Sequence, residues 1–407
     1  MRIAIHDYAG HPFQFELSRE LAKRGHDVCH FFFDADIGPK GATQIGPDDP
    51  TSFSIRPVTI DSRYSKSNFI QRLLGDIRYG AAISKMVLEF RPDVIISGNS
   101  PLEVQRQLLR AARRGGVPFV FWMQDFYSLA ISSLLSDKWS GLGMVVARYY
   151  RRMERYLLCQ SDQIILIGET FVPTLATFGD LIHKTSIIPN WGAINTIPVC
   201  EKESAWAQDH ALANRFVFLY SGTMALKHDP ELIWRLAIAF HDDPNVAIVI
   251  AATGISVDLL KERQHTNPQP NLVFLPLQSA DHFPALLGAA NVLIALLVSD
   301  AGEFSVPSKI LSYLCADRPI LLSAPNHNPA AVTVAKAGAG LIVDADNPDA
   351  FVAAARTLRQ NETMRRALGA AGRRYAEETF DIKAVADKFC AVIRSAQQEQ
   401  LVPNINR

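Results

Sequence analysis

The chain has 407 residues, and its 41 Lys and Arg residues balance its 41 Asp and Glu residues. The length favours two domains, and a composition of 48% hydrophobic and 20% charged residues is typical of a globular protein. The zero net charge argues against a protein dedicated to nucleic-acid binding.

The first half of the chain alternates predicted strands with amphipathic helices. A strand at 1–6 precedes a helix at 12–24 whose apolar residues recur every four positions, and a strand follows at 26–33. Residues 34–80 are rich in Gly, Pro, Asp and Ser and are predicted to be irregular. Further strands are expected at 93–97, 119–123, 163–167 and 185–188, with helices between them.

The second half repeats this alternation. Strands are predicted at 216–220, 246–251, 272–275, 292–297, 320–322 and 341–343. Helices are predicted at 230–240, near 285, from 308, at 348–359 and at 382–396. The longest apolar stretch, 283–299, contains Pro284 and Asn291, so we expect a helix, a turn and a strand there in place of a membrane span.

The two series are separated by Pro189–Gly192 and the charged segment that follows it. We expect an N-terminal domain at 1–190, a linker at 191–204, a C-terminal domain at 205–381, and a last helix within 382–407 that packs back on the N-terminal domain. Sequential strand–helix units predict an α/β fold of two doubly wound, Rossmann-like domains with parallel sheets. Such sheets bind ligands at the carboxyl ends of their strands, so we expect the site in a cleft between the domains.

The cysteines and the N-terminal residues indicate in which cellular compartment we expect the protein. No C-x-x-C pair occurs, which favours buried thiols in a reducing compartment over a disulfide framework or a zinc site. The five cysteines are Cys29, Cys159, Cys200, Cys315 and Cys390. The chain begins directly with the strand pattern of Arg2–Asp7, so we expect no signal peptide.

The segment from Glu303 to Pro319 carries the strongest functional signal. Val306-Pro307-Ser308-Lys309 opens a predicted helix, whose first turn offers unpaired N–H groups and roughly half a positive charge to a phosphate. Lys309 adds a full charge, and Glu303 can accept hydrogen bonds from sugar hydroxyls. These residues together suit a nucleotide-sugar, although Lys309 as a plain surface lysine and Ser308 as a plain helix cap remain alternatives.

Three further loops carry candidate residues. Lys227 follows a predicted turn at Ser221-Gly222-Thr223, where Gly222 allows the backbone to approach a ligand closely. Gln124-Asp125 follows the strand at 119–123, and Gly10-His11-Pro12 follows the first strand. For Lys227, Asp125 and His11 the alternatives are a solvated loop lysine, a turn or cap residue, and a hydrogen-bonded loop histidine.

Five segments, taken in order, resemble glycosyltransferase family 4 of the GT-B fold, and most closely its bacterial enzymes of capsule, exopolysaccharide or O-antigen synthesis. The segments are RGHDV (24–28), FWMQDFYS (121–128), IIPNW (187–191), YSGTMALKHDPEL (220–232) and VPSKILSYLCADRPIL (306–321). The resemblance implies transfer of a sugar from a nucleotide-sugar with retention at the anomeric carbon and without a metal. The donor phosphate then helps to deprotonate the acceptor, and a cationic pocket neutralises the leaving diphosphate.

The resemblance also implies residue roles. Glu303 matches the first acid of the family's two-glutamate motif, and Ser312 stands in place of the second. Lys227 matches a diphosphate-binding lysine, Thr223 stands near the position of a family arginine, and Lys309 can replace that missing cation. The remaining donor-site residues are Gly222, Leu277, Ser305, Val306, Pro307 and Ser308.

On the acceptor side, Gly10 and His11 occupy the place of the family's glycine loop. Gln124 replaces a family histidine near the transferred sugar, and Asp125 can position the acceptor. We count Glu303, Lys309, Lys227 and Asp125 as the catalytic candidates, and we expect neither a metal nor another cofactor.

We expect UDP-sugar as the donor, a polyprenyl-diphosphate-linked glycan as the acceptor, and no nucleic-acid partner. The basic and aromatic runs 63–78 and 148–156 suggest peripheral contact of a cytoplasmic protein with an anionic membrane, with ordinary solvated helix faces as the alternative. Two other functions stay open at this point: a nucleotide-sugar epimerase of the GT-B fold, and a non-catalytic partner of another transferase.

Overall fold

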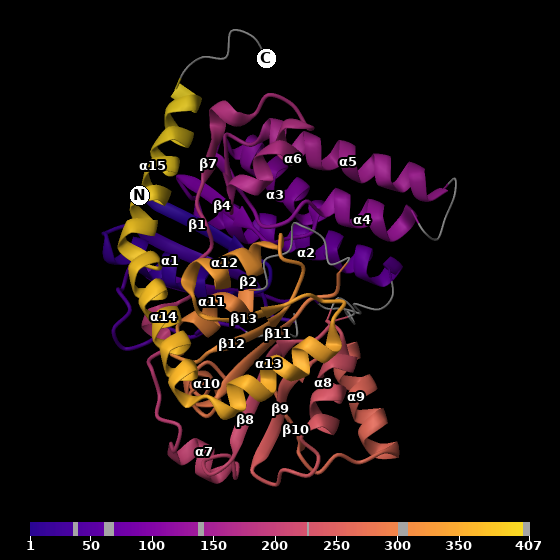
Figure 1. The fold of residues 1–407 in the computed structure, drawn as a ribbon. Coiled ribbons are helices and arrows are strands. Elements are labelled where there is room, and N and C mark those ends of the chain that lie inside the picture. Colours follow the sequence, from indigo (N-terminus) through magenta and orange to yellow (C-terminus); the bar gives the residue numbers. More distant parts are fainter. Residues whose placement is uncertain (36–39, 61–68, 137–141, 226–227, 300–307, 402–407) are drawn as a thin grey trace. The chain divides into compact units, whose positions relative to one another are not determined.

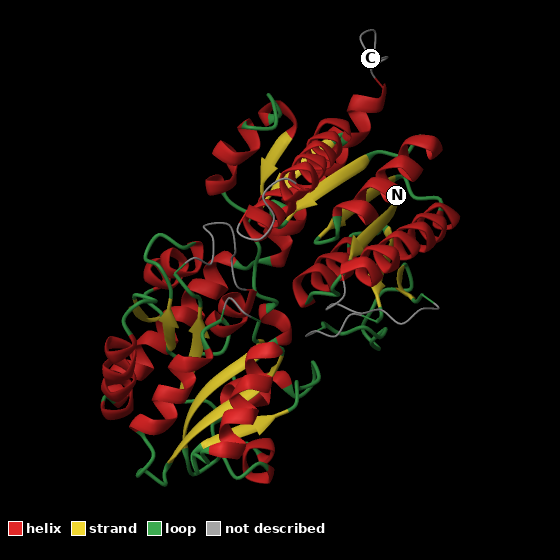
Figure 2. Cartoon of the chain, turned by 90° about the vertical axis from the view of Figure 1, so that its right-hand side faces the viewer, coloured by secondary structure: helices red, strands yellow, loops and turns green. Residues whose placement is uncertain are grey.

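The computed structural model describes residues 1–35, 40–60, 69–136, 142–225, 228–299 and 308–401 (Figure 1). Its backbone contacts divide the chain into two compact units. Unit 1 contains Met1–Ile37, Gly41–Asn190 and Ile382–Arg407, and unit 2 contains Gly38–Lys40 and Trp191–Asp381. Each unit has a parallel sheet with helices packed against it (Figure 2), so the prediction of two α/β domains is confirmed.

Unit 1 is built on a seven-stranded sheet in the order β3-β2-β1-β4-β5-β6-β7. The strands are β1 (Arg2–Asp7), β2 (Asp27–Phe33), β3 (Phe53–Val58), β4 (Val94–Gly98), β5 (Phe119–Met123), β6 (Gln163–Leu166) and β7 (Thr185–Ile187). The helices are α1 (Pro12–Lys23), α2 (Phe69–Phe90), α3 (Leu102–Gly115), α4 (Tyr127–Ser136), α5 (Leu142–Gln160), α6 (Val172–Ala176) and α15 (Ile382–Leu401). The strand order reverses between β1 and β4, which makes their carboxyl ends the expected binding edge.

Unit 2 is built on a six-stranded sheet in the order β10-β9-β8-β11-β12-β13. The strands are β8 (Phe216–Thr223), β9 (Val246–Thr253), β10 (Leu272–Leu275), β11 (Val292–Leu296), β12 (Ile320–Ser323) and β13 (Gly340–Val343). The helices are α7 (Ala205–Asp209), α8 (Pro230–Ala239), α9 (Ile255–Thr266), α10 (Phe283–Gly288), α11 (Ser308–Leu314), α12 (Pro329–Ala337), α13 (Pro348–Gln360) and α14 (Glu362–Thr379). Here the order reverses between β8 and β11.

Local sequence explains many of the helix ends. Asp229 caps α8 by accepting a hydrogen bond from the Glu231 N–H, with Pro230 in the first turn. Asn328 caps α12 in the same way, and Gly338 ends that helix in the left-handed conformation with φ 60°. The central strands β1, β4, β5 and β11 are almost wholly buried, as expected for parallel strands covered on both faces.

Two sequence predictions about secondary structure were wrong. Residues 34–80 are not irregular throughout, because they contain β3 and the start of α2. The β3 strand includes Pro57 and lies at the sheet edge, where a missing N–H is tolerated. Ser221-Gly222-Thr223 is not a turn after the strand, since these residues continue β8 and pair with Ala251–Thr253.

The last helix, α15, belongs to unit 1. The ring of Phe389 lies 4.8 Å from that of Trp122 in β5, and the carboxylate of Asp387 pairs with Arg24 at 2.6 Å. Arg24 also donates a hydrogen bond to the Lys383 carbonyl at 2.7 Å. These contacts hold α15 against unit 1.

Candidate active site

In unit 2, the end of β8 holds the ammonium group of Lys309. The Lys309 Nζ lies 3.5 Å from the ring centroid of Tyr220 and 3.5 Å from the Thr223 carbonyl oxygen. A Cβ added to Gly222, where φ is 106°, would lie 4.0 Å from the same nitrogen. The structure therefore places a positive charge at the carboxyl end of β8, beside Gly222, which has no side chain to cover the backbone.

Two buried tyrosines hold this arrangement. Tyr313 follows Lys309 by four residues, on the same face of α11, and its hydroxyl accepts a hydrogen bond from the Ser221 N–H at 2.9 Å. The Tyr220 hydroxyl donates to the Thr223 carbonyl at 2.9 Å. Burial raises the pKa of both phenols above the ordinary tyrosine value, so both stay neutral. They consequently tie α11 to β8 without adding a negative charge beside Lys309.

The two residues that follow β8, Met224 and Ala225, are also held by hydrogen bonds. The Met224 N–H donates to the Thr253 carbonyl at 2.8 Å, and the Ala225 N–H donates to Nδ1 of buried His228 at 2.9 Å. This loop leads to the capped start of α8. Lys227, which was predicted to bind the diphosphate, lies outside the described residues, so its role stays a prediction.

Several other predicted donor residues also lie outside the described part of the chain. These are Glu303, Ser305, Val306 and Pro307, together with the side chain of Ser308. Ser312 is half-buried on α11, and Leu277 is half-buried in the segment after β10. Of the predicted donor residues, the structure brings together Lys309, Gly222 and Thr223.

In unit 1, the expected binding edge contains a buried carboxylate. Asp7 ends β1 and is fully buried. Its carboxylate accepts hydrogen bonds from the backbone N–H groups of Ala9 and His11 and lies 3.3 Å from the His11 Nδ1. Burial raises the pKa of Asp7, but interactions with His11 outweigh it and lower that pKa below the ordinary value. Asp7 is therefore ionised and orients His11.

The loop after β4 meets the same histidine. The Asn99 side-chain nitrogen lies 3.2 Å from the His11 Nδ1, and Asn99 itself has a positive φ of 45°. Gly10 has a φ of 75°, and its carbonyl oxygen accepts a hydrogen bond from the Gly41 N–H at 2.9 Å. The predicted residues Gly10 and His11 thus lie where the strand order reverses between β1 and β4. The contacts of His11 are those of a hydrogen-bonded loop histidine, which was the alternative given for it.

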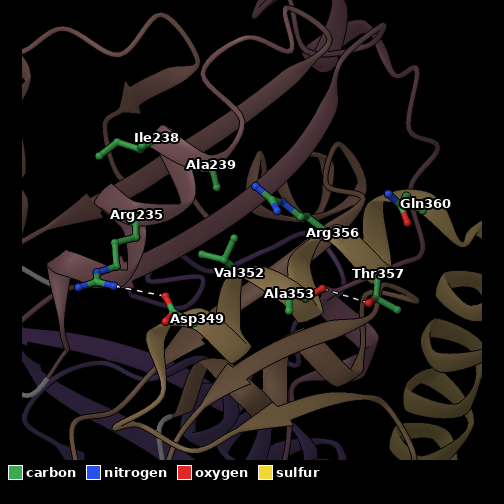
Figure 3. Close-up of a pocket in the computed structure, with 9 residues that line it drawn as sticks. All are labelled: Arg235, Ile238, Ala239, Asp349, Val352, Ala353, Arg356, Thr357 and Gln360. Atoms are coloured by element: carbon green, nitrogen blue, oxygen red, sulfur yellow. Dashed lines mark hydrogen bonds and ion pairs between the residues drawn. The ribbon is translucent and has the colours of Figure 1, made fainter.

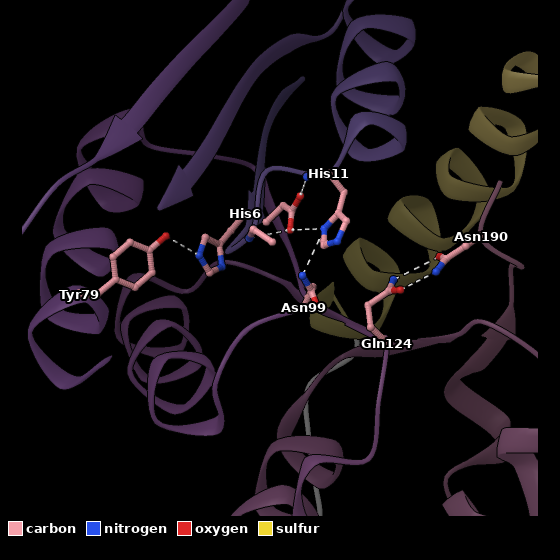
Figure 4. Close-up of polar contacts among 8 residues, drawn as sticks. His6, His11, Tyr79, Asn99, Gln124 and Asn190 are labelled. Atoms are coloured by element: carbon pink, nitrogen blue, oxygen red, sulfur yellow. Dashed lines mark hydrogen bonds and ion pairs between the residues drawn. The ribbon is translucent and has the colours of Figure 1, made fainter. Parts of the chain in front are cut away.

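A neighbouring histidine is structural. The ring nitrogens of His6 lie 2.8 Å from the Ser97 hydroxyl and 2.9 Å from the Tyr79 hydroxyl (Figure 4). Burial lowers the pKa of His6 to about 4, so the ring is neutral near pH 7. We assign it to the core below the binding edge.

Gln124, at the end of β5, forms a reciprocal amide pair with Asn190. The Asn190 amide donates to Gln124 Oε1 at 2.6 Å, and the Gln124 amide donates back at 3.3 Å (Figure 4). This pair leaves the amide group of Gln124 with further hydrogen-bonding capacity, because each amide has two donors and two lone pairs. Asp125 follows and is half-buried.

Comparisons with known proteins agree with this architecture. A family model described as "Glycosyl transferase 4-like domain" matches residues 12–191, and one described as "Glycosyl transferases group 1" matches residues 202–375. A protein of Escherichia coli (strain K12), named as the colanic acid biosynthesis glycosyl transferase WcaI, is 25% identical over 313 residues. That match covers 75% of this chain and 74% of the relative.

The chain is a family 4 glycosyltransferase with the GT-B fold.

Solved structures share the fold of this glycosyltransferase at low identity. Anabaena Alr3699/HepE, solved in complex with UDP, gives a TM-score of 0.68 at 14% identity, covering 97% of this chain and 100% of the other. Sucrose-phosphate synthase from Thermosynechococcus elongatus gives a TM-score of 0.70 at 15% identity, and the match covers 97% of this chain and 98% of the other. WaaG, a glycosyltransferase involved in lipopolysaccharide biosynthesis, gives a TM-score of 0.66 at 15% identity, and the match covers 96% of this chain and 99% of the other.

A surface hollow of this glycosyltransferase lies elsewhere in unit 2. It has a volume of 610 Å³ and is formed by α8 and α13, where Arg235 and Asp349 form an ion pair at 3.6 Å (Figure 3). None of the predicted site residues lines it. We therefore base the active site on the sheet edges.

Sequence reasoning missed Tyr220, Tyr313 and Asp7. The spacing of Lys309 and Tyr313 would have placed both on one helix face, and Asp7 is an acid at the end of a buried strand. For Tyr220 no sequence signal existed, because its role depends on how α11 packs on β8.

Among the described residues, no cluster of His, Cys, Asp or Glu could hold a metal ion. Within the same ranges, no helix combines the length and apolar character that a membrane crossing requires. All five cysteines are free thiols, of which Cys29 and Cys315 are buried.

Proposed function

We propose that this glycosyltransferase moves a hexose or N-acetylhexosamine from a UDP-sugar to a polyprenyl-diphosphate-linked glycan, with retention at the anomeric carbon and without a metal ion. Two similarities support the proposal. The relative WcaI is named for colanic acid biosynthesis, and the HepE structure was solved in complex with UDP. Both concern other proteins, so the argument for this chain depends on its own residues.

The position of Lys309 carries the proposal. Its ammonium is held at the end of β8 by the ring of Tyr220 and the Thr223 carbonyl oxygen. The first turn of α11 adds N–H groups with a positive dipole end. A diphosphate that enters here would be stabilised by charge-assisted hydrogen bonds, and Gly222 would let it approach the backbone.

The same charge can serve the reaction. As the glycosidic bond to the donor breaks, negative charge grows on the leaving UDP, and a preorganised ammonium stabilises it without reorganisation cost. The donor phosphate would take the proton of the acceptor hydroxyl on the same face of the sugar. In this scheme Lys309 and Lys227 bind the leaving group, and Glu303 binds hydroxyls of the donor sugar.

Unit 1 would position the acceptor. His11, oriented by the Asp7 carboxylate, and Gln124, oriented by Asn190, present hydrogen-bonding groups at the carboxyl ends of β1 and β5. Such groups can both donate hydrogen bonds to sugar hydroxyls and accept them, which suits the glycan part of the acceptor. Asp125 lies beside Gln124 in the chain and stays a candidate for positioning the acceptor.

A donor-turnover assay in excess chelator tests this function. Purified protein should release sugar slowly from a UDP-sugar in EDTA, and NMR should show the released or transferred sugar with the anomeric configuration of the donor. Activity that disappears in EDTA and returns with Mg²⁺ or Mn²⁺ would contradict metal independence. An inverted product would contradict retention, and an epimerised UDP-sugar would assign the protein to the isomerase alternative.

A further inference from the structure

The outer face of α3 and α5 in unit 1 is strongly cationic. We call it the α3–α5 surface. Its arginines are Arg106 and Arg110 of α3 and Arg148, Arg151, Arg152 and Arg155 of α5. Arg106 is half-buried and the others are exposed. The guanidinium of Arg106 donates to the Tyr149 hydroxyl at 3.2 Å, so the two helices form one continuous surface.

The acids of the same helices point inward. Glu103 of α3 is buried and accepts a hydrogen bond from the Tyr150 hydroxyl at 2.5 Å. Glu154 of α5 is buried and accepts one from the Ser128 hydroxyl at 2.5 Å. In the described parts of α3 and α5, no acidic side chain is exposed beside the arginines. The positive charge of this surface is therefore not balanced by its own helices.

Large apolar side chains lie among the arginines. On α5, Met144 and Val145 are 70% and 65% exposed, and Tyr149 and Tyr156 are 48% and 40% exposed. Positions 145, 149, 152 and 156 recur at helical spacing, so they share one face of the helix. A shallow hollow of 190 Å³ between α3 and α5 is lined by Tyr149, Met153 and Tyr156 together with Arg106, Arg110 and Arg152.

The first half of α2 extends this character. α2 packs against α3, and the Gln107 side chain donates to the Ile77 carbonyl at 3.0 Å. There Arg72, Leu74, Ile77 and Arg78 are exposed. Asp76 is buried, accepts a hydrogen bond from the Tyr8 hydroxyl at 2.9 Å and lies 3.8 Å from the Arg72 guanidinium, so it offsets part of the charge of that arginine. Three neighbouring helices of unit 1 thus repeat one design, with arginines and apolar groups outside and acids inside.

We propose that the α3–α5 surface docks on an anionic lipid bilayer. Arginine heads can reach lipid phosphates while their stems and the tyrosine rings lie at the headgroup level, and Met144 and Val145 can enter the acyl boundary. A nucleic acid would account for the arginines but not for the exposed methionine and valine. The lipid-linked acceptor of the proposed function gives this docking a purpose, but the docking can be tested without any turnover.

Flotation with lipid vesicles tests the proposal. The full-length protein should float with vesicles of phosphatidylcholine and phosphatidylglycerol and stay below with phosphatidylcholine alone, and binding should weaken as salt is raised. The triple variant Arg148→Gln, Arg152→Gln, Arg155→Gln should lower the partition coefficient about 100-fold, at roughly a factor of five for each charge. Met144→Ser with Val145→Ser should lower it about tenfold even at low salt.

A charge-matched control is Lys336→Gln, Arg356→Gln, Arg374→Gln, which removes exposed basic residues of unit 2 and should float like the wild type. Circular dichroism of each variant confirms that it is folded. Equal loss in the control and in the arginine variant would overturn the proposal, because net charge alone would then explain binding. Absence of flotation by the wild type, or stronger binding to single-stranded DNA than to anionic vesicles, would overturn it as well. UDP binding, measured in parallel, reports separately on the proposed function.

Discussion

The two sheets of this glycosyltransferase have the same topology at their switch points but opposite chemistry. The edge of unit 2 holds an ammonium group, that of Lys309, over the ring of Tyr220. The edge of unit 1 holds an ionised carboxylate, that of Asp7, against N–H groups and His11. The difference teaches that the fold supplies two equivalent edges, and that a few side chains decide which edge can accept an anion.

The largest expected effect concerns Lys309. Lys309→Ala should weaken UDP binding about 10- to 100-fold, the value of one or more charge-assisted hydrogen bonds at ~1.5–3 kcal/mol, and Lys309→Arg should recover part of it. Isothermal titration calorimetry measures the affinity. Lys336→Ala, an exposed lysine of the same unit, is the control. If Lys309→Ala bound UDP as tightly as the wild type, the edge of unit 2 would not be distinguished from that of unit 1 by anion binding through Lys309.

The next effect concerns the aromatic seat of that lysine. Tyr220→Leu should lower UDP affinity about 10-fold, since a cation–π contact contributes about 0.5–2 kcal/mol, and Tyr220→Phe should stay within about threefold of the wild type. Because Tyr220 is fully buried, Tyr220→Leu should also lower the Tm. The affinity of the folded fraction is therefore the relevant measurement. If Tyr220→Phe and Tyr220→Leu lower the UDP affinity equally, the aromatic ring does not position Lys309.

A smaller effect is expected at the edge of unit 1. Gln124→Ala should reduce kcat of transfer about 10-fold by removing one hydrogen bond to substrate, while the UDP affinity stays unchanged. Asn190→Ala should reduce kcat about threefold, because it only releases Gln124. Steady-state kinetics with saturating donor gives both values. Loss of UDP affinity in Gln124→Ala would show that the two edges do not divide the substrates as proposed.

The smallest effect extends the comparison to pH. Burial raises the pKa of Glu154 in unit 1 to about 7 from its ordinary 4.5. The folded state therefore holds this proton more tightly than the unfolded state, and the resulting stability is present below pH 4.5 and lost as pH rises to 7. Glu154→Gln should raise the Tm by about 5 °C at pH 8 and leave it unchanged at pH 4.5.

Differential scanning calorimetry at both pH values checks this prediction. The exposed Glu362, which pairs with Arg366 at 2.6 Å, provides the control variant Glu362→Gln, whose Tm at pH 8 should lie within about 2 °C of the wild type because an exposed ion pair contributes little stability. Buried His6 acts in the opposite direction, because its pKa of about 4 removes stability as pH falls from 6.5. Variant and wild type must therefore be compared at equal pH. A Tm gain for Glu154→Gln that is the same at both values would contradict the raised pKa.

Much of the fold could be predicted from the sequence because strand and helix periods are local properties. The strands at 119–123 and 272–275 were predicted with the bounds of β5 and β10, since each is a short apolar run between turn residues. The edge strand β3 was not predicted, because its burial is one-sided and it contains Arg56 and Pro57. An edge strand lacks the continuous apolar run by which a buried parallel strand is recognised in a sequence.

The candidate site was less predictable than the fold. Lys309 could be placed from its position at a helix start, but Tyr220 and Tyr313 act through contacts between segments 92 residues apart, such as that of Ser221 with Tyr313. Gln124 could be placed at a strand end, but its partner Asn190 lies 66 residues away. Periodicity reports which face a side chain occupies, and it carries no information about which distant side chain meets it.

The glycine after Trp191 has a consequence for reading mutational data. Gly192 lies against the Leu311 carbonyl, and a Cβ at this position would also lie 2.7 Å from the Cys315 sulfur. Any side chain would push against the backbone of α11, the helix that carries Lys309. In a saturation scan, position 192 should look as intolerant as a reacting group although it contributes no atom to the chemistry. Intolerance there measures the fit between the chain and a helix, and it should not be counted as evidence for a role in turnover.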